Sequence, residues 1–234
     1  MRRISVLLFL LFAVTAAIAQ EHVTPELIMT LKNAQDAQVS PDASRVLFTL
    51  NRPRAAGEKP GVDWHEIWMV STKGGVPVRF TSGSRGDLSP RWSADGSQIA
   101  FLSNRGSNEK YQIYLIRANG GEATALTSFE EGVDSISWSP DGTRIAFTMT
   151  DPRSSAELED ERAGRDWQVA DEKYRFRRVY VLELATGKHW QVTRDAMNVW
   201  EYEWSPDGSQ FLILASRTPH TDDQYMASQI YTVA

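Results

Sequence analysis

Two apolar patterns run along this chain, and both predict β-strands. Segments such as Ile99–Ser103 and Ile113–Ile116 are apolar at nearly every position, as is expected of a strand that is buried on both faces. Val199–Trp204 instead alternates apolar and acidic residues, as a half-exposed strand does. Strands that are apolar on both faces indicate sheets that are packed between two neighbouring sheets.

A ten-residue motif recurs four times within this pattern. The copies are VSPDASRVLF from Val39, WSADGSQIAF from Trp92, WSPDGTRIAF from Trp138 and WSPDGSQFLI from Trp204. A strand-like segment follows the first three copies, from Glu66, Gln112 and Arg178, and a short closing segment follows it, from Val78, Thr124 and Trp190. Repeats of about 40–50 residues that carry several short strands predict a β-propeller.

Each copy of the motif predicts a hairpin turn. The proline of SPDG suits a type I turn, and the glycine can adopt a positive φ, which together join two antiparallel strands. The first copy has Ala43 at the glycine position, where a positive φ costs an alanine roughly 1 kcal/mol. We therefore expect a different turn type at Ala43. The tryptophans are expected to pack between sheets.

These elements predict an all-β fold, a partial β-propeller of about four blades whose last blade is incomplete. The expected parts are a signal peptide at 1–19, a lead-in at 20–38 that looks helical, blades at 39–91, 92–137 and 138–203, and a partial blade at 204–234. The third blade holds a charged insertion at 151–176, with a short helix around Ser155–Ala163. The alternative is a closed four-bladed propeller in which residues 22–38 complete the last blade.

The first residues have the composition of an export signal. Arg2 and Arg3 precede an apolar run from Ile4 to Ile18, and Ala17–Ala19 fits a small-x-small cleavage pattern. An uncleaved anchor or a buried N-terminal helix is the alternative interpretation. We expect cleavage after Ala19, export to the periplasm or the extracellular space, and no membrane attachment afterwards.

Charge and cysteine content exclude several classes of function. The net charge of −5 gives no general attraction for nucleic acid or anionic lipid. The chain contains no cysteine, which excludes disulfides, thiol catalysis and thiolate metal sites.

No side chain stands out as catalytic, cofactor-binding or metal-binding, and no cofactor is expected. The four histidines lack the spacing of metal ligands and are interpreted as surface or loop residues: His22, His65, His189 and His220. A run of carboxylates in the insertion could hold a cation or a substrate amino group, although such a run is usually a solvated face: Glu157, Glu159, Asp160 and Glu161. The glycine pairs at 74–75 and 120–121 are interpreted as turn glycines, because no helix follows them as in a phosphate loop.

The order of these motifs resembles the N-terminal propeller of the prolyl oligopeptidase family, closest to its acylaminoacyl-peptidase and bacterial dipeptidyl-peptidase branch. The lead-in, the GGEA…LT closing at Gly120–Thr127 and the insertion at 151–176 carry the resemblance. It implies a seven- or eight-bladed propeller that caps an α/β-hydrolase domain and admits short peptides. The partners it implies are that hydrolase domain of the parent chain and the peptides themselves.

The catalytic triad of that family lies in the hydrolase domain, so no catalytic residue is carried over to this chain. The segments that come nearest to a G-x-S-x-G nucleophile elbow, at Ser82 and Arg105, lack the paired glycines. Two other functions stay open. SPDG repeats also occur in TolB-type periplasmic propellers, which suggests a protein-binding module, and a stand-alone four-bladed module would bind a partner through one face.

Overall fold

The structure is a computed structural model that describes residues 24–28, 30–55, 57–58, 60–81, 86–165 and 174–234. The chain forms two compact units, residues 1–31 and 32–234. In the first, α1 (Pro25–Ile28) is a single helical turn, and the Thr24 side chain accepts a hydrogen bond from the Leu27 amide at 3.1 Å. The expected signal peptide at 1–19 lies outside the described residues.

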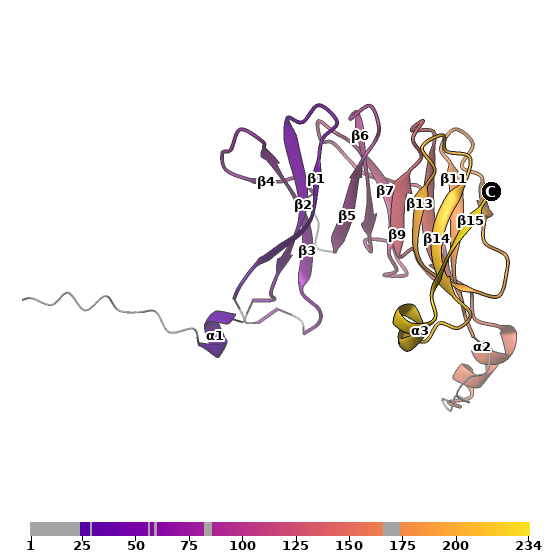
Figure 1. The fold of residues 1–234 in the computed structure, drawn as a ribbon. Coiled ribbons are helices and arrows are strands. Elements are labelled where there is room, and N and C mark those ends of the chain that lie inside the picture. Colours follow the sequence, from indigo (N-terminus) through magenta and orange to yellow (C-terminus); the bar gives the residue numbers. More distant parts are fainter. Residues whose placement is uncertain (1–23, 29, 56, 59, 82–85, 166–173) are drawn as a thin grey trace, which may run out of the picture. The chain divides into compact units, whose positions relative to one another are not determined.

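The second unit consists of four antiparallel sheets (Figure 1). In each sheet, strands that follow one another in the sequence are hydrogen-bonded neighbours. Sheet 1 holds β1 (Asn33–Val39), β2 (Arg45–Arg52), β3 (Trp64–Ser71) and β4 (Val78–Arg79); sheet 2 holds β5 (Asp87–Trp92), β6 (Gln98–Ser103), β7 (Gln112–Arg117) and β8 (Thr124–Ala125). Sheet 3 holds β9 (Ser135–Trp138), β10 (Arg144–Thr150), β11 (Arg177–Glu183) and β12 (His189–Gln191); sheet 4 holds β13 (Asn198–Trp204), β14 (Phe211–Ser216) and β15 (Gln229–Val233).

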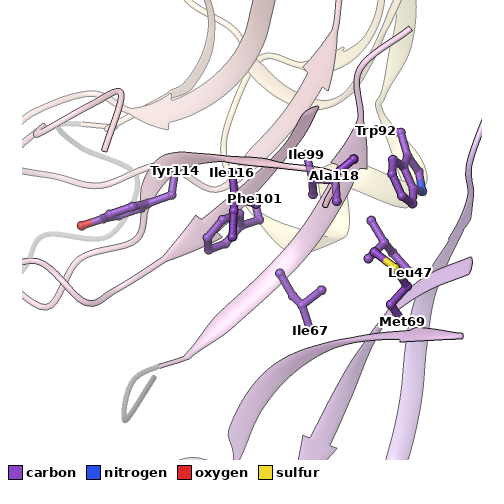
Figure 2. Close-up of a cluster of buried hydrophobic side chains, with 9 residues drawn as sticks. All are labelled: Leu47, Ile67, Met69, Trp92, Ile99, Phe101, Tyr114, Ile116 and Ala118. Atoms are coloured by element: carbon purple, nitrogen blue, oxygen red, sulfur yellow. The ribbon is translucent and has the colours of Figure 1, made fainter. Parts of the chain in front are cut away.

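Successive sheets pack face to face through separate apolar clusters. The middle strands are buried on both faces, as β6 and β11 show, because each has a neighbouring sheet on either side. In Figure 2, side chains of sheet 1 point toward side chains of sheet 2. That cluster consists of Leu47, Ile67, Met69, Trp92, Ile99, Phe101, Tyr114, Ile116 and Ala118. The all-β fold and the stacked sheets of a partial propeller are confirmed.

The motif tryptophans join neighbouring sheets, as expected. The indole Nε1 of Trp92 donates to the carbonyl of Gln38 at 3.1 Å, and that of Trp138 donates to the carbonyl of Arg91 at 3.0 Å. Each bond runs from the first strand of one sheet to the first strand of the sheet before it. The first strands therefore lie next to one another in sheets 1 to 3.

Sheet 4 meets sheet 3 in a different way. The Nε1 atom of Trp204 is buried and has no hydrogen-bond partner among the described residues. The hydroxyl of Tyr202 donates instead to the carbonyl of Ala146 at 3.0 Å. Tyr202 is partly buried, and the loss of solvent around its hydroxyl raises the pKa of that group.

The expectation of another turn type at Ala43 is wrong. Ala43 has a φ of 55°, close to the 70°, 69° and 67° of Gly96, Gly142 and Gly208. Its amide donates to the Ser40 carbonyl at 2.8 Å, as the Gly96 amide donates to Ser93 at 2.9 Å. The hydrogen bonds of the turn hold the alanine in this strained conformation.

The expectation of a helical lead-in through residue 38 is also wrong. The helix ends at Ile28, and Asn33–Val39 forms β1, which pairs with β2 in sheet 1. A bulge between Gln35 and Gln38 leaves Asp36 at a φ of 53°. Because β1 pairs in sheet 1, its residues do not complete the last sheet, as the four-bladed alternative required.

Two short helices interrupt the strand connections. Helix α2 (Ser155–Arg162) lies in the charged insertion, which confirms the helix expected there. Its N-terminus has a capping box, in which the Ser154 side chain accepts from the Glu157 amide and the Glu157 side chain accepts from the Ser154 amide. Helix α3 (Thr221–Met226) lies between β14 and β15. No helix in the described part of the chain is long and apolar enough to span a bilayer.

Candidate functional site

The long connections of the sheets share one end, which we call the loop end. It carries the connections between the second and third strands, at 53–63, 104–111, 151–176 and 217–228. Antiparallel strands alternate in direction, so the loop end lies opposite the SPDG turns. Helices α2 and α3 both lie there (Figure 1).

An arginine lies at or just beyond the end of the second strand in sheets 1, 2 and 3 and forms an ion pair at the loop end. Each arginine meets a carboxylate whose side chain is at most 13% exposed, and low exposure strengthens such a pair relative to one in water. The pairs are Arg52–Glu66 at 3.5 Å, Arg105–Asp87 at 2.8 Å and Arg153–Glu131 at 3.6 Å.

The pair in sheet 2 is the most buried of the three. One guanidinium nitrogen of Arg105 donates to both carboxylate oxygens of Asp87 at 2.8 Å, and its Nε donates to the Ser103 hydroxyl at 2.8 Å. The same guanidinium lies over the rings of Phe101 and Tyr114, at 5.4 and 5.1 Å from their centroids. These contacts give Arg105 a structural role at the loop end of sheet 2.

The insertion of sheet 3 leaves the sheet through a neck formed by Asp151 and Phe176. The Asp151 amide donates to the Phe176 carbonyl at 2.8 Å, and the Phe176 amide donates to the Asp151 carboxylate at 3.1 Å. Arg178, which is buried, donates to both carboxylate oxygens of Asp151 at 3.0–3.1 Å. Arg178 also donates to the carbonyl of Asp195, which ties the neck to the chain that leads into sheet 4.

We call the described residues beyond the neck, 152–165 and 174–175, the arm. Glu131, from the connection that leads into sheet 3, contacts both sides of the arm beside the neck. Its carboxylate accepts from Arg175 at 3.0 Å and from the backbone amide of Arg153 at 3.2 Å. The arm is thus held at its base by two carboxylates, those of Asp151 and Glu131.

Most of the carboxylates on α2 are used within the arm. Glu157 belongs to the capping box, Asp160 pairs with Arg165 at 2.7 Å and Glu161 pairs with Arg153 at 2.6 Å. Glu159 is exposed and forms no ion pair with any other described residue. A single free carboxylate on a held helix can bind an ammonium group, and a substrate role for the cluster stays a prediction.

The described histidines lie apart from one another. His65 is half-buried in β3, and burial lowers its pKa although Asp63 opposes this. His189 packs its ring against the edge of Phe129, with centroids 4.9 Å apart, and His220 lies 3.2 Å from the Tyr174 hydroxyl through its Nε2. His22 lies outside the described residues. Within the described ranges, no three histidine or acidic side chains are grouped so that they could hold a metal ion.

The remaining sequence candidates occupy structural positions. The glycines at 74–75 and 120–121 have φ values from 89° to 119° and lie in strand connections, which confirms them as turn glycines. Val199–Trp204 lies in β13 and is exposed only in part, as expected. The segment from Arg105 lies in the β6–β7 connection, and most of the segment from Ser82 lies outside the described residues.

The sequence reading missed the ion pairs of the loop end. A signal for their arginines was present, because NRP, NRG and DPR lie at or just beyond the end of the second strand in three successive repeats, at 51–53, 104–106 and 151–153. Their carboxylate partners have no common position in the repeat. Glu131 and Arg175 are 44 residues apart in the chain, so no local pattern could pair them.

Two further ion pairs join separate segments of the chain. Arg91 in β5 donates to both carboxylate oxygens of Asp36 in β1 at 2.8 Å. Arg177 in β11 lies 3.8 Å from the carboxylate of Asp134. Burial raises the pKa of Asp134, and Arg177 counteracts part of that effect. These pairs have a structural role, because they hold neighbouring segments together. The arm is therefore the candidate site.

Comparison with known families gives one match that covers more than half of the chain. The model of the TolB beta propeller domain matches residues 26–172. That range runs from α1 through sheets 1 and 2 and into the insertion of sheet 3.

Among individual proteins, dipeptidyl-peptidase 5 of Porphyromonas gingivalis is 33% identical over 88 residues, which are 38% of this chain and 12% of the relative. TolB from Acinetobacter baumannii has a similar structure, with a TM-score of 0.56, 15% identity, and coverage of 86% of this chain and 41% of that one. The acylaminoacyl peptidase of Pyrococcus horikoshii has a TM-score of 0.56 at 15% identity, and the match covers 87% of this chain and 31% of that one. The resemblance to peptidase propellers is confirmed, over a small part of each relative's length.

Proposed function

Because the chain belongs to the TolB beta propeller domain family, we propose that it is the propeller part of an exported peptidase. In this proposal the propeller contains no catalytic residue and limits which substrates reach an α/β-hydrolase domain. The observation that carries the proposal is the 33% identity with dipeptidyl-peptidase 5 over 88 residues. The expected substrates are short peptides, since stacked rigid sheets exclude folded proteins on steric grounds.

The arm supports a role in substrate access. It lies at the loop end and is anchored by Asp151 and Glu131, so its helix can stand at a defined place beside a substrate path. The exposed carboxylate of Glu159 is the group on α2 that we expect to meet a peptide amino group. This role for Glu159 belongs to the proposal.

The decisive experiment uses the complete product of the native gene. We expect a fluorophosphonate probe to label it and short peptide amides to be hydrolysed, while a folded protein of similar sequence composition is left intact. The isolated 234-residue chain is the control and should show neither labelling nor hydrolysis. A complete gene product that carries no fluorophosphonate-reactive serine would refute the proposal.

Export is tested separately from peptidase activity. We expect the mature protein in the periplasm or the culture medium, with Gln20 as its first residue after cleavage behind Ala19. N-terminal sequencing of the fractionated protein measures this. An intact Met1 in the membrane fraction would favour the uncleaved anchor instead.

A second candidate function is protein binding by a TolB-like propeller, favoured by the fold similarity to TolB. It predicts that the complete gene product resists labelling by fluorophosphonate and forms a stable complex with one defined periplasmic protein. Labelling by the probe therefore separates the two candidates.

A further inference from the structure

The arm is connected to the rest of sheet 3 by more than its neck. The Glu131 carboxylate lies 3.0 Å from the guanidinium of Arg175, on one side of the neck. It also accepts a hydrogen bond from the backbone amide of Arg153, on the other side, at 3.2 Å. The carboxylate side chain is only 13% exposed. Hydrogen bonds to a charged group that is shielded from water are stronger than those to neutral groups.

Arg153 carries this contact into the helix of the arm. One end of its guanidinium lies 3.6 Å from Glu131, and the other end donates to Glu161 on α2 at 2.6 Å. Glu131, Arg153 and Glu161 thus form a continuous charged chain from the base of the arm to its helix. No side chain of α2 is fully buried and Leu158 is only half-buried, so apolar packing contributes little to its orientation.

Glu131 is itself held in place by the backbone around it. The next residue, Gly132, has a φ of +86°, and a Cβ there would come within 3.2 Å of the Tyr111 carbonyl. The following amide, that of Val133, donates to the same carbonyl at 2.8 Å. A glycine is needed for this close approach, and the approach fixes the point from which the Glu131 side chain extends.

The neck keeps its own contacts when the Glu131 carboxylate is removed, since Asp151 also holds Arg175 through its carbonyl at 2.9 Å. Asp151 and the buried Arg178 close the neck, and the full pairing of β10 with β11 begins there. Removal of the Glu131 charge therefore leaves the sheet intact and affects what lies beyond the neck.

We propose that Glu131 is the positioning residue of the arm, which holds α2 in one orientation over the loop end through Arg153 and Arg175. The inference concerns the conformation of this chain and holds whether or not the parent protein is a peptidase. A loss of the Glu131 charge should free the arm to move while the four sheets stay folded.

The chain lacks cysteine, so two engineered cysteines give specific spin-label sites. Ala163→Cys at the end of α2 and Ala185→Cys in the exposed turn after β11 report the distance between the arm and sheet 3 by double electron–electron resonance. We expect a narrow distance distribution in the double-cysteine protein that keeps Glu131. Glu131→Gln, which keeps the size and removes the charge, should broaden that distribution at least about twofold and speed amide exchange in α2 about tenfold.

Glu159→Gln is the matched control, since it removes one carboxylate from the same helix without touching the charged chain. It should leave both the distance distribution and amide exchange unchanged, and the melting temperature should be the same in both variants. If Glu131→Gln fails to fold, Arg153→Gln replaces it and should broaden the distribution equally. A distribution that stays narrow in the folded Glu131→Gln variant, or in its folded Arg153→Gln replacement, overturns the proposal.

Discussion

At the scale of the residue, the four SPDG-type turns show one local design with a single strained member. In each turn a serine hydroxyl donates to the aspartate two residues later, as Ser40 does to Asp42 at 2.5 Å and Ser93 to Asp95 at 2.6 Å. The residue after the aspartate adopts a positive φ. Three turns have glycine there and Ala43 has a methyl group, so Ala43 carries a cost that the others avoid.

Replacement of this alanine should stabilise the protein. Ala43→Gly relieves a left-handed strain of roughly 1–2 kcal/mol and gives the unfolded chain about 0.4–1 kcal/mol of extra entropy. The net gain expected is therefore about 0.5–1 kcal/mol in the free energy of unfolding, measured by urea denaturation. Gly142→Ala is the matched control and should destabilise by about 1 kcal/mol, because its new Cβ meets only the Ala94 Cβ at 3.8 Å and strain is its main effect.

The same turns should make stability depend on pH in the acid range. Hydrogen bonds from neighbouring serines or a threonine lower the pKa of the four turn carboxylates from 3.8 to about 2: Asp42, Asp95, Asp141 and Asp207. Since the folded pKa lies below the unfolded one, the stabilisation is complete above pH 3.8 and is lost as the pH falls toward 2.

We expect the melting temperature to fall across that window, and Asp95→Asn to make the fall shallower. Thermal unfolding followed by circular dichroism from pH 5 to pH 2 measures both effects. A variant with an unchanged slope would contradict the assignment of the acid sensitivity to these turns.

At the scale of the element, α2 is a helix that its sequence and its base support, with no help from a core. Its capping box satisfies the first amides, and the ion pairs with Arg153 and Arg165 flank it. Because no residue of α2 is fully buried, we expect its stability to be mainly local.

Removal of the cap should therefore act on the helix alone. Ser154→Ala is expected to cost α2 about 1 kcal/mol, visible as faster amide exchange in Leu158–Arg162. The melting temperature of the sheets should not change. Ser155→Ala, one residue further along, is the control and should leave exchange unaltered, whereas a global loss of stability in Ser154→Ala would show that the arm and the sheets fold together.

The elements also show which features a sequence can reveal. The second and third strands were recognisable because they are continuously apolar, and α2 because its charges lack strand periodicity. Strand β1 was not, because Asn33–Val39 is an edge strand with mostly exposed polar residues and so carries no periodic signal. The Glu131–Arg175 pair was not, because its partners are 44 residues apart in the chain.

At the scale of the whole second unit, each apolar cluster of the described residues joins two successive sheets. Three separate apolar clusters join sheets 1 and 2, sheets 2 and 3, and sheets 3 and 4. Stability in such an array is a sum of contributions from each sheet and from each interface. The interfaces differ in their polar ties, since Trp92 and Trp138 donate across an interface and Trp204 does not.

This difference predicts unequal effects of one substitution. Trp92→Phe removes the hydrogen bond to the Gln38 carbonyl, whereas Trp204→Phe removes an indole N–H that has no partner in the described part of the chain. We expect Trp92→Phe to lower the free energy of unfolding by about 0.5–1.5 kcal/mol more than Trp204→Phe. Chemical denaturation of the two variants measures the difference. Equal losses would show that buried apolar area alone, without the hydrogen bond, sets the stability of these interfaces.

The tryptophan bonds have a consequence for how such chains change over evolutionary time. Their acceptors at Gln38 and Arg91 are main-chain carbonyls, which every amino acid supplies, so the link places no demand on the identity of the residue that receives it. A whole repeat can then be duplicated, lost or exchanged with another and still find its attachment point. The number of repeats is then free to drift, while a joint of the kind made by Trp92 and Trp138 stays available to each new neighbour.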